Sequence, residues 1–169
     1  IKEILEEIKE FNNNLYMCCL LTYGCLLRPH REIRELRWGD FSDNLSHIYL
    51  SGKRNKSKKN RIVPVPKFIA RELIPNRQDL NIFSNRIKPF NISYFKTIWY
   101  KYKIQSNLIE ENQTLYSFRH SGATDIFKRT GSIRKLQAAL GHSSLEISLI
   151  YLRNLEVCEL KEEDMPSIY

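Results

Sequence analysis

Several side chains of this sequence are of types that handle phosphate groups. Arg28 and Arg119 each stand at the edge of an apolar stretch, and a guanidinium offers a planar, permanently charged fork that matches two phosphate oxygens. His142 follows Gly141, which is expected to stop a helix, so its ring should be free to point into a site. Tyr151 lies nine positions further on, and its phenol is a candidate nucleophile.

The densest positive charge in the chain runs from Lys53 to Arg61. A charge run of this kind is more often a solvated hairpin tip than a binding site. Here strand-like sequences flank it on both sides, which predicts a projecting basic hairpin. Such a hairpin suits a DNA groove or backbone, where each lysine displaces a condensed counterion.

Each of these residues also has an ordinary structural explanation when it is taken singly. Glu32 and Asp125 lie within helical reach of Arg28 and Arg119, so both arginines could form structural ion pairs. Tyr151 lies among leucines and isoleucines, and a tyrosine in such a segment is usually part of the core. Only the spacing of the whole set favours chemistry.

Composition restricts the classes of protein to which the chain can belong. It has 169 residues, 42% of them hydrophobic, which fits one domain with a sizeable core. A formal charge of +8 and a pI of about 9.4 favour a polyanionic partner, either nucleic acid or an acidic membrane surface. The four cysteines show no metal-ligand or CxxC spacing, so we expect no metal site and a reducing, intracellular setting. No apolar run is long enough to span a bilayer.

The segments that carry the candidate residues are predicted to be mainly helical. Apolar spacing predicts an amphipathic helix over residues 1–11 and a buried helix over residues 15–27. Pro29 then starts a helix that extends to about Trp38, and it biases Arg28 away from helical conformation. Arg28 is therefore expected at a break beside free backbone N–H groups, which is a good place for an anion.

The middle of the chain has a different character. Residues 47–50 and 61–65 predict two short strands that flank the basic run, the second at a sheet edge because it contains proline. Helices are expected over residues 67–74 and 93–102, with a loop over residues 75–89.

Three helices are expected in the last third of the chain. The first covers residues 116–130, and the second starts after Ser132 and stops at Gly141. The third begins at residues 143–146, which have the form of a capping box, and carries Tyr151. The fold class is thus mainly α with a small antiparallel β-sheet (α+β).

The order and spacing of these segments resemble the catalytic domain of tyrosine recombinases, the phage integrase family. The resemblance covers nearly the whole chain. It is carried by Leu26-Leu27-Arg28-Pro29 leading into Glu32-Ile33-Arg34-Glu35-Leu36-Arg37-Trp38-Gly39-Asp40, by Ser51-Gly52-Lys53 leading to Arg61-Ile62-Val63-Pro64, and above all by the block from Phe118-Arg119-His120 through Leu140-Gly141-His142 to Tyr151.

The resemblance implies a role for each matching residue. Tyr151 would attack the scissile phosphate and form a 3′-phosphotyrosine link, releasing a 5′-hydroxyl. Arg28 and Arg119 would hold the non-bridging oxygens, and His142 would hydrogen-bond a phosphate oxygen. No metal or nucleotide cofactor is implied, because the phosphotyrosine stores the energy of the broken bond.

The resemblance also implies a general acid on the basic hairpin. Lys53, with Lys56 as the alternative, would protonate the leaving 5′ oxygen. Tyr116 occupies the position three before Arg119 where the family often has His or Lys, and its phenol can donate a hydrogen bond but stays neutral near pH 7.

A second departure from the family pattern follows the first arginine. Arg31 stands where many relatives carry Glu, and Glu32 lies one position further on. We therefore assign Glu32 as a structural support.

Partners and organisation follow from the same resemblance. It implies double-stranded DNA as the partner, a homotetramer on DNA, a monomer for the isolated domain, and no membrane role. We expect residues 1–169 to form one catalytic domain without the DNA-clamping domain that usually precedes it, and residues 154–169 to be a candidate docking segment. The expected location is the bacterial cytoplasm, with the nucleoid.

Two further functions stay open at this point. A type IB topoisomerase uses a similar set of residues to relax supercoils, and a DNA-binding module would keep the set only as a relic. We rank site-specific recombination, for integration or excision of a mobile element, ahead of both. The reason is that all five catalytic positions are filled, which a relic does not need.

Overall fold

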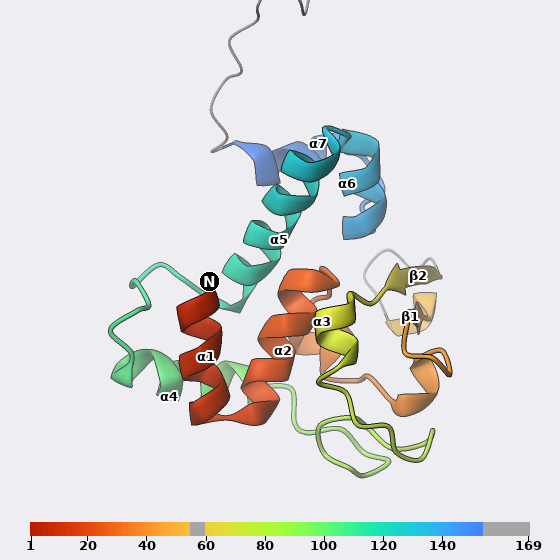
Figure 1. Cartoon of the computed structure of the whole chain (residues 1–169), viewed down its shortest axis with the longest axis vertical. Helices are drawn as coiled ribbons and strands as arrows, with labels where there is room; N and C mark the ends of the chain where they lie inside the picture. The colour runs from red at the N-terminus through yellow and green to blue at the C-terminus, as the bar shows by residue number, and fades with distance from the viewer. Residues whose placement is uncertain (55–59, 154–169) are drawn as a thin grey trace, which may run out of the picture.

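The computed structural model describes residues 1–54 and 60–153, and within them the chain is mainly helical with one small antiparallel sheet (Figure 1). This confirms the predicted fold class. The elements are α1 (Lys2–Phe11), α2 (Asn13–Gly24), η1 (Pro29–Ile33), η2 (Trp38–Asp40), β1 (His47–Leu50), η3 (Gly52–Arg54), β2 (Arg61–Pro64), α3 (Lys67–Ala70), α4 (Tyr94–Gln105), α5 (Leu115–Thr130), α6 (Ile133–Leu140), α7 (Leu145–Leu149) and η4 (Ile150–Leu152). Lys56 and the candidate docking segment 154–169 lie outside the described residues.

Helix α2 forms the centre of the main core. It is apolar around its whole circumference, which is typical of a helix that packs on several sides. The Asn12 side chain accepts a hydrogen bond from the Leu15 backbone N–H at 2.9 Å. Because this cap starts the helix at Asn13, the predicted start at residue 15 is two residues late, and the predicted end at residue 27 is too far along the chain.

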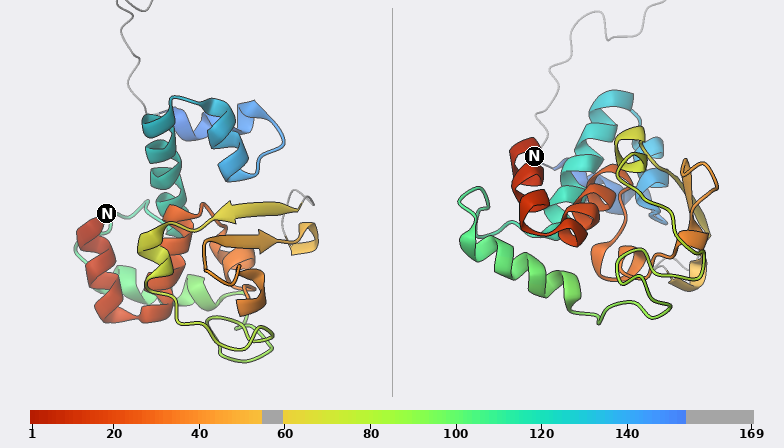
Figure 2. Two further views of the ribbon diagram at one scale, coloured as in Figure 1. Left: turned by 45° about the vertical axis from the view of Figure 1, so that its right-hand side comes forward. Right: turned by 60° about the horizontal axis from the view of Figure 1, so that its bottom comes forward.

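Helix α5 connects this core to the C-terminal helices. Figure 2 shows it running from α2 to the end of the molecule that holds α6 and α7. A side chain at Gly122 would place its Cβ 2.0 Å from the Tyr23 carbonyl oxygen, so only glycine allows the two helices to approach this closely. Beyond this crossing, Leu26, Ala123, Leu136 and Leu140 form a second, smaller core.

The two predicted strands pair as expected. β1 and β2 are antiparallel, with His47 opposite Pro64 and Leu50 opposite Arg61. The predicted helix over residues 67–74 is shorter, since α3 covers only Lys67–Ala70. The predicted helix from Pro29 to about Trp38 begins as expected but is shorter: a π-helix covers Pro29–Ile33, and a separate 3₁₀ turn begins at Trp38.

The C-terminal helices bring the candidate residues towards the core. Gly131 and Gly141 end α5 and α6 in the left-handed conformation, with φ of 59° and 66°, as predicted. The capping box predicted over residues 143–146 is wrong, because Ser144 is the N-cap of α7 and makes no side-chain cap hydrogen bond. Tyr151 lies in the 3₁₀ turn η4 that continues α7.

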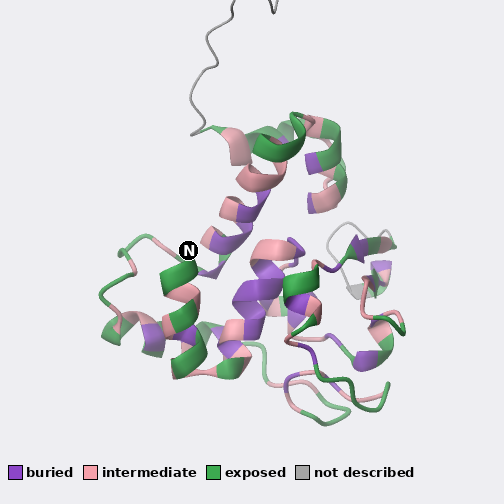
Figure 3. Cartoon of the chain, viewed as in Figure 1, coloured by how far each residue is buried: buried purple, intermediate pink, exposed green. Residues whose placement is uncertain are grey.

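Burial follows the two cores. In Figure 3 the buried residues gather along α2 and along parts of α5 and α6, whereas α7 is largely exposed. Helices long and apolar enough to cross a membrane are absent from the described parts of the chain.

Candidate active site

Arg119 is the most deeply buried charged group of the site. Its side chain, carried by α5, is 0% exposed. Nη2 donates to the Leu140 carbonyl at 2.8 Å, and Nε donates to the Tyr151 hydroxyl at 3.4 Å. Nη1 is buried and has no partner among the residues that the structure describes. Because an unpartnered buried donor is costly, this nitrogen marks a place for a ligand atom.

Arg28 is held by the carboxylate of Glu32. Its Nη1 donates to Glu32 Oε1 at 2.7 Å, and its backbone N–H donates to Oε2 at 2.8 Å. The Glu32 side chain is only 1% exposed. The ion pair that the sequence left open for Arg28 therefore exists, and it fixes the guanidinium at the break before η1. Asp125, the corresponding candidate for Arg119, instead accepts a hydrogen bond from Tyr23.

Glu32 lies four residues after Arg28, one position beyond the acidic residue that the resemblance implies, and the turn that carries it is a π-helix. Ile33 N–H donates to the Arg28 carbonyl at 3.0 Å, and Arg34 N–H to the Pro29 carbonyl at 3.2 Å, both across five residues. A π-turn accommodates one residue more than an α-turn, and such turns are frequent at functional sites. The Glu32 carboxylate faces the arginine from the first turn of η1.

Arg61 is a site residue that the sequence analysis did not identify. It lies at the start of β2, its side chain is 12% exposed, and its Nη2 donates to Glu32 Oε2 at 3.3 Å. With Gly141 and His142 it borders an open hollow of about 330 Å³. The sequence alone did not distinguish Arg61 from the rest of the basic run, because five other residues of that run are also lysine or arginine.

His142 lies directly after α6, with its ring next to Tyr151. Nδ1 is 3.1 Å from Ser148 Oγ, and the ring centroid is 5.5 Å from that of Tyr151. Burial lowers the pKa of His142 to about 4, and the positive charges of Arg119, Arg28 and Arg61 contribute. The imidazole is therefore neutral near pH 7.

Tyr151 contacts a second histidine ring as well. The His120 ring stacks on it at a centroid distance of 5.3 Å and an interplanar angle of 22°. This contact of His120 was not predicted from the sequence. The two histidine rings restrict the orientation of the Tyr151 phenol, and Arg119 Nε donates a hydrogen bond to its oxygen.

Tyr116 lies near the arginines but is less enclosed. It is 42% exposed, and its ring centroid is 6.0 Å from that of His30. Burial raises the pKa of Tyr116, while the charges of Arg28 and Arg119 lower it. The phenol is thus neutral near pH 7 and within electrostatic reach of both arginines.

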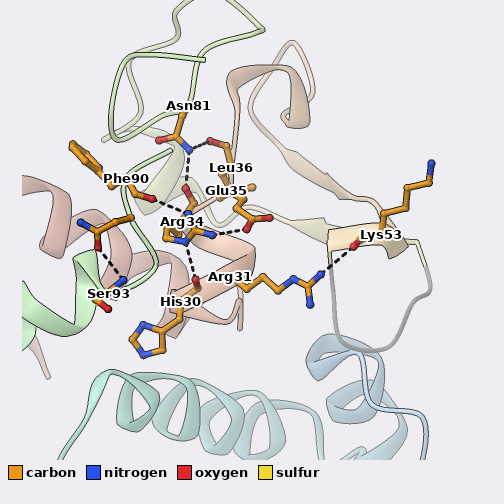
Figure 4. Close-up of polar contacts among 10 residues, drawn as sticks. His30, Arg31, Arg34, Glu35, Leu36, Lys53, Asn81, Phe90 and Ser93 are labelled. Atoms are coloured by element: carbon orange, nitrogen blue, oxygen red, sulfur yellow. Dashed lines mark hydrogen bonds and ion pairs between the residues drawn. The ribbon is translucent and has the colours of Figure 1, made fainter. Parts of the chain in front are cut away.

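Lys53 is the predicted residue that the structure does not bring to this cluster. Figure 4 shows its side chain extending away from its own carbonyl, which accepts a hydrogen bond from Arg31 at 3.3 Å. Lys53 lines another hollow, together with Glu35, Arg37 and Asp40. Among the described residues, no contact joins its ammonium to Arg28, Arg119 or Tyr151. Groups of side chains able to hold a metal ion are likewise absent from the described residues.

A network behind the site anchors this region. In Figure 4 Arg34 donates to the carbonyls of His30 and Phe90, at 3.0 and 2.7 Å, and pairs with Glu35. Asn81 donates to the carbonyls of Arg34 and Leu36, both at 2.8 Å. These bonds tie η1 to the long loop before α4.

Comparison with known proteins adds independent findings. A model of the phage integrase family matches residues 1–157. Tyrosine recombinase XerA of Thermococcus kodakarensis is 29% identical over 160 residues, which are 90% of this chain and 55% of the relative. A crystal structure of XerA recombinase has a TM-score of 0.71 at 22% identity, over 96% of this chain and 57% of that one. A structure of XerH bound to its difH substrate, before cleavage, has a TM-score of 0.69 at 22% identity, over 90% and 48%.

These findings agree on the fold and on the family. The arrangement of helices is that of solved tyrosine recombinases, while the chain spans about 55% of the curated relative. Since the family model covers all but the last residues, the chain belongs to the phage integrase family.

Proposed function

We propose that the protein cleaves and rejoins DNA strands at specific sites through a covalent bond to Tyr151, in the integration or excision of a mobile element. The observation that carries the proposal is the buried Arg119, whose Nε donates to the Tyr151 hydroxyl while Nη1 has no partner among the described residues. The Arg119 guanidinium thus contacts the proposed nucleophile through one nitrogen and has a second nitrogen available for the phosphate that the nucleophile would attack.

In the first step, Arg28 and Arg119 would bind the scissile phosphate while Tyr151 attacks it. Tyr151 Oη forms a bond to phosphorus and releases its proton to solvent water, and negative charge accumulates on the non-bridging oxygens as phosphorus becomes five-coordinate. Arg119 and Arg28 are held in fixed positions by Leu140 and Glu32, so they need not reorganise as this charge develops. In this five-coordinate state phosphorus is bonded both to Tyr151 Oη and to the 5′ oxygen that will leave.

The second step needs a proton for the leaving oxygen. We assign this role to Lys53, which would turn from its hollow towards the site when DNA is bound. The bond from phosphorus to the 5′ oxygen breaks, and the oxygen takes up the proton to become a 5′-hydroxyl. A 5′-hydroxyl attacks the phosphotyrosine in the reverse reaction, which restores the phosphodiester and the phenol without a nucleotide cofactor.

His142 would act as a neutral hydrogen-bond partner. Its Nδ1 faces Ser148, so Nε2 is the nitrogen that is turned to other groups and would bind a phosphate oxygen. Tyr116 would contribute at most a hydrogen bond, since its phenol is neutral. Double-stranded DNA as substrate is supported by the net charge of +8 and by the XerH relative, which was solved on its DNA site.

We further propose that residues 1–169 form one catalytic domain and that four copies act together on DNA. Family membership supports both statements. The same membership supports a location with the nucleoid.

Covalent trapping tests the proposed function and does not require a chosen target sequence. The complete protein is incubated with a pool of duplexes that carry randomised sequence and one nick, so that the short 5′-hydroxyl fragment diffuses away after cleavage. Adducts that survive denaturing electrophoresis are isolated, and their DNA is sequenced. We expect adducts with one preferred sequence, and none with Tyr151→Phe.

Other outcomes would assign a different function. DNA binding with no adduct from any duplex indicates a binding module only. Adducts without sequence preference, together with relaxation of supercoiled plasmid, indicate a topoisomerase. An adduct that persists in Tyr151→Phe shows that another residue is the nucleophile.

A further inference from the structure

Arg61 is buried to a degree that its sequence context does not explain. Its guanidinium lies 29 residues along the chain from the carboxylate that it contacts, and its side chain is 12% exposed. Its Nε is buried without a partner among the described residues. Burial lowers the pKa of Arg61, Glu32 raises it, and the charges of Arg119 and Arg28 lower it further. The guanidinium nevertheless stays charged at neutral pH. Burying a charged group is costly, so a function for this charge is expected.

Glu32 is the link between Arg61 and the proposed phosphate site. Its carboxylate receives the Arg28 backbone N–H at 2.8 Å, Arg28 Nη1 at 2.7 Å and Arg61 Nη2 at 3.3 Å. A carboxylate has about four lone-pair positions, so one group can hold both side chains at once. Removing Arg61 would take away one of these three donors and leave the carboxylate held only by Arg28, the residue that it has to position.

Arg61 also contacts the other side of the site. Its Nη1 lies 2.3 Å from the position that a Cβ on residue 141 would take, so the guanidinium packs directly on the backbone at Gly141. The next residue is His142, and the end of α6 also supplies the Leu140 carbonyl that holds Arg119. Arg61 therefore spans from the Arg28 side to the His142 side.

The charges of the cluster do not balance. Three guanidinium groups, Arg28, Arg61 and Arg119, influence one another, and Glu32 is the carboxylate bonded to two of them. The excess is two positive charges, and His142 adds none near neutral pH. A phosphodiester carries one negative charge, and the five-coordinate state on the way to phosphotyrosine carries two. An excess of two therefore matches the transition state better than the substrate, which is the condition for catalysis.

We propose that Arg61 is a positioning residue of the phosphate site, which acts through Glu32 to fix Arg28 and which completes the positive charge of the cluster. This inference rests on the proposed function. It adds a residue from β2 to a site otherwise built from the start of η1 and the C-terminal helices.

Single-turnover cleavage gives the first test, with the DNA sequence recovered by covalent trapping. We expect Arg61→Gln and Glu32→Gln each to slow cleavage on the order of 100-fold, since a misplaced reacting group costs about this much. The double variant should be no slower than the slower single variant, because both changes disable one network. Arg61→Lys, which keeps the charge but not the fork, should lose about tenfold. Arg77→Gln removes the same charge from a surface pair with Asp79 and should stay within about twofold.

A charge-neutral substrate separates a positioning role from a merely structural one. In a methylphosphonate a methyl group replaces one non-bridging oxygen, so the charge that Arg28 would meet is missing. The loss caused by Arg61→Gln should then shrink to about tenfold or less. Equal losses with both substrates, or losses that multiply in the double variant, would overturn the inference.

A measurement without DNA keeps this inference separate from the proposed function. The Nε–H signal of Arg28 in a ¹⁵N-labelled protein should shift or broaden in Arg61→Gln and in Glu32→Gln, and should be unchanged in Arg77→Gln. If the wild-type protein forms no adduct, the proposed function fails and this signal alone decides the inference. If the Arg28 signal is the same in Arg61→Gln as in wild type, Arg61 does not position Arg28, whatever the protein does to DNA.

Discussion

Replacement of Gly141 by alanine tests how closely the end of α6 packs on Arg61. Gly141 and Gly131 end successive helices with φ of 66° and 59°, so alanine at either position carries the same left-handed strain, about 1–2 kcal/mol. Their surroundings differ. A Cβ at residue 131 meets nothing within 4 Å, whereas a Cβ at residue 141 would lie 2.3 Å from Arg61 Nη1 and 3.0 Å from its Cδ. Gly131→Ala is therefore a matched control for strain.

The additional cost at residue 141 follows from what Arg61 must give up. The Arg61 side chain can move, but it then loses its 3.3 Å bond to Glu32, and a hydrogen bond to a charged group contributes about 1.5–3 kcal/mol. We expect Gly131→Ala to lower the free energy of unfolding by about 1–2 kcal/mol and Gly141→Ala by about 2.5–5 kcal/mol. Urea denaturation followed by circular dichroism measures both.

The Arg61→Ala background completes the test. Without the guanidinium, Gly141→Ala should cost only the strain, about 1–2 kcal/mol, as Gly131→Ala does. The reasoning is refuted if both glycine variants lose equal stability in the wild-type background. It is refuted equally if the cost of Gly141→Ala is the same with and without Arg61.

Three further predictions follow from the site and the core. The His142 pKa of about 4 lies below the 6.5 of an ordinary histidine, so between these pH values the unfolded state binds more protons than the folded state, and His142 makes the protein less stable as the pH falls through this window. NMR titration of the His142 ring should give a midpoint near pH 4, and a midpoint near 6.5 contradicts the buried environment. Tyr116→Phe should slow adduct formation by about tenfold or less, against about 100- to 1000-fold for Arg119→Gln; equal losses would give Tyr116 a larger role. Burial raises the pKa of Cys18 and Cys25, the latter to about 12. A Cys158→Ser protein should therefore resist labelling by a thiol reagent at pH 8 until it is denatured. Rapid labelling of the native protein would show that α2 opens.

Much of the fold is readable from local sequence signals. Gly131 and Gly141 end helices because only glycine readily takes a left-handed backbone, and Ser132 caps α6 by accepting from Lys135 N–H at 3.3 Å. Short elements were less predictable: α3 and α7 stop early, since packing and not propensity decides where a short helix ends.

Side-chain contacts across the fold could be predicted only in part. The spacing of Arg119 and Tyr151 indicated their proximity through the resemblance, but nothing local indicates that Nε of the arginine meets the phenol oxygen. Arg61 and Lys53 belong to the same basic run, and the structure separates them: one turns inward to Glu32 and the other outward. Sequence does not reveal this difference, because it depends on where a strand pairs and not on residue type.

The π-helix shows how one irregular turn can preserve a site while the sequence departs from its family pattern. Arg31 stands three residues after Arg28, at the position where the resemblance implies an acidic residue. In the π-turn, Glu32 faces Arg28, and Arg31 reaches the Lys53 carbonyl at the base of the hairpin. Ile33 at the end of this turn and Leu36 after it are both buried in the core, so the irregular backbone is compatible with close packing on that side. Despite the departure at Arg31, Arg28 thus has an acidic partner in Glu32.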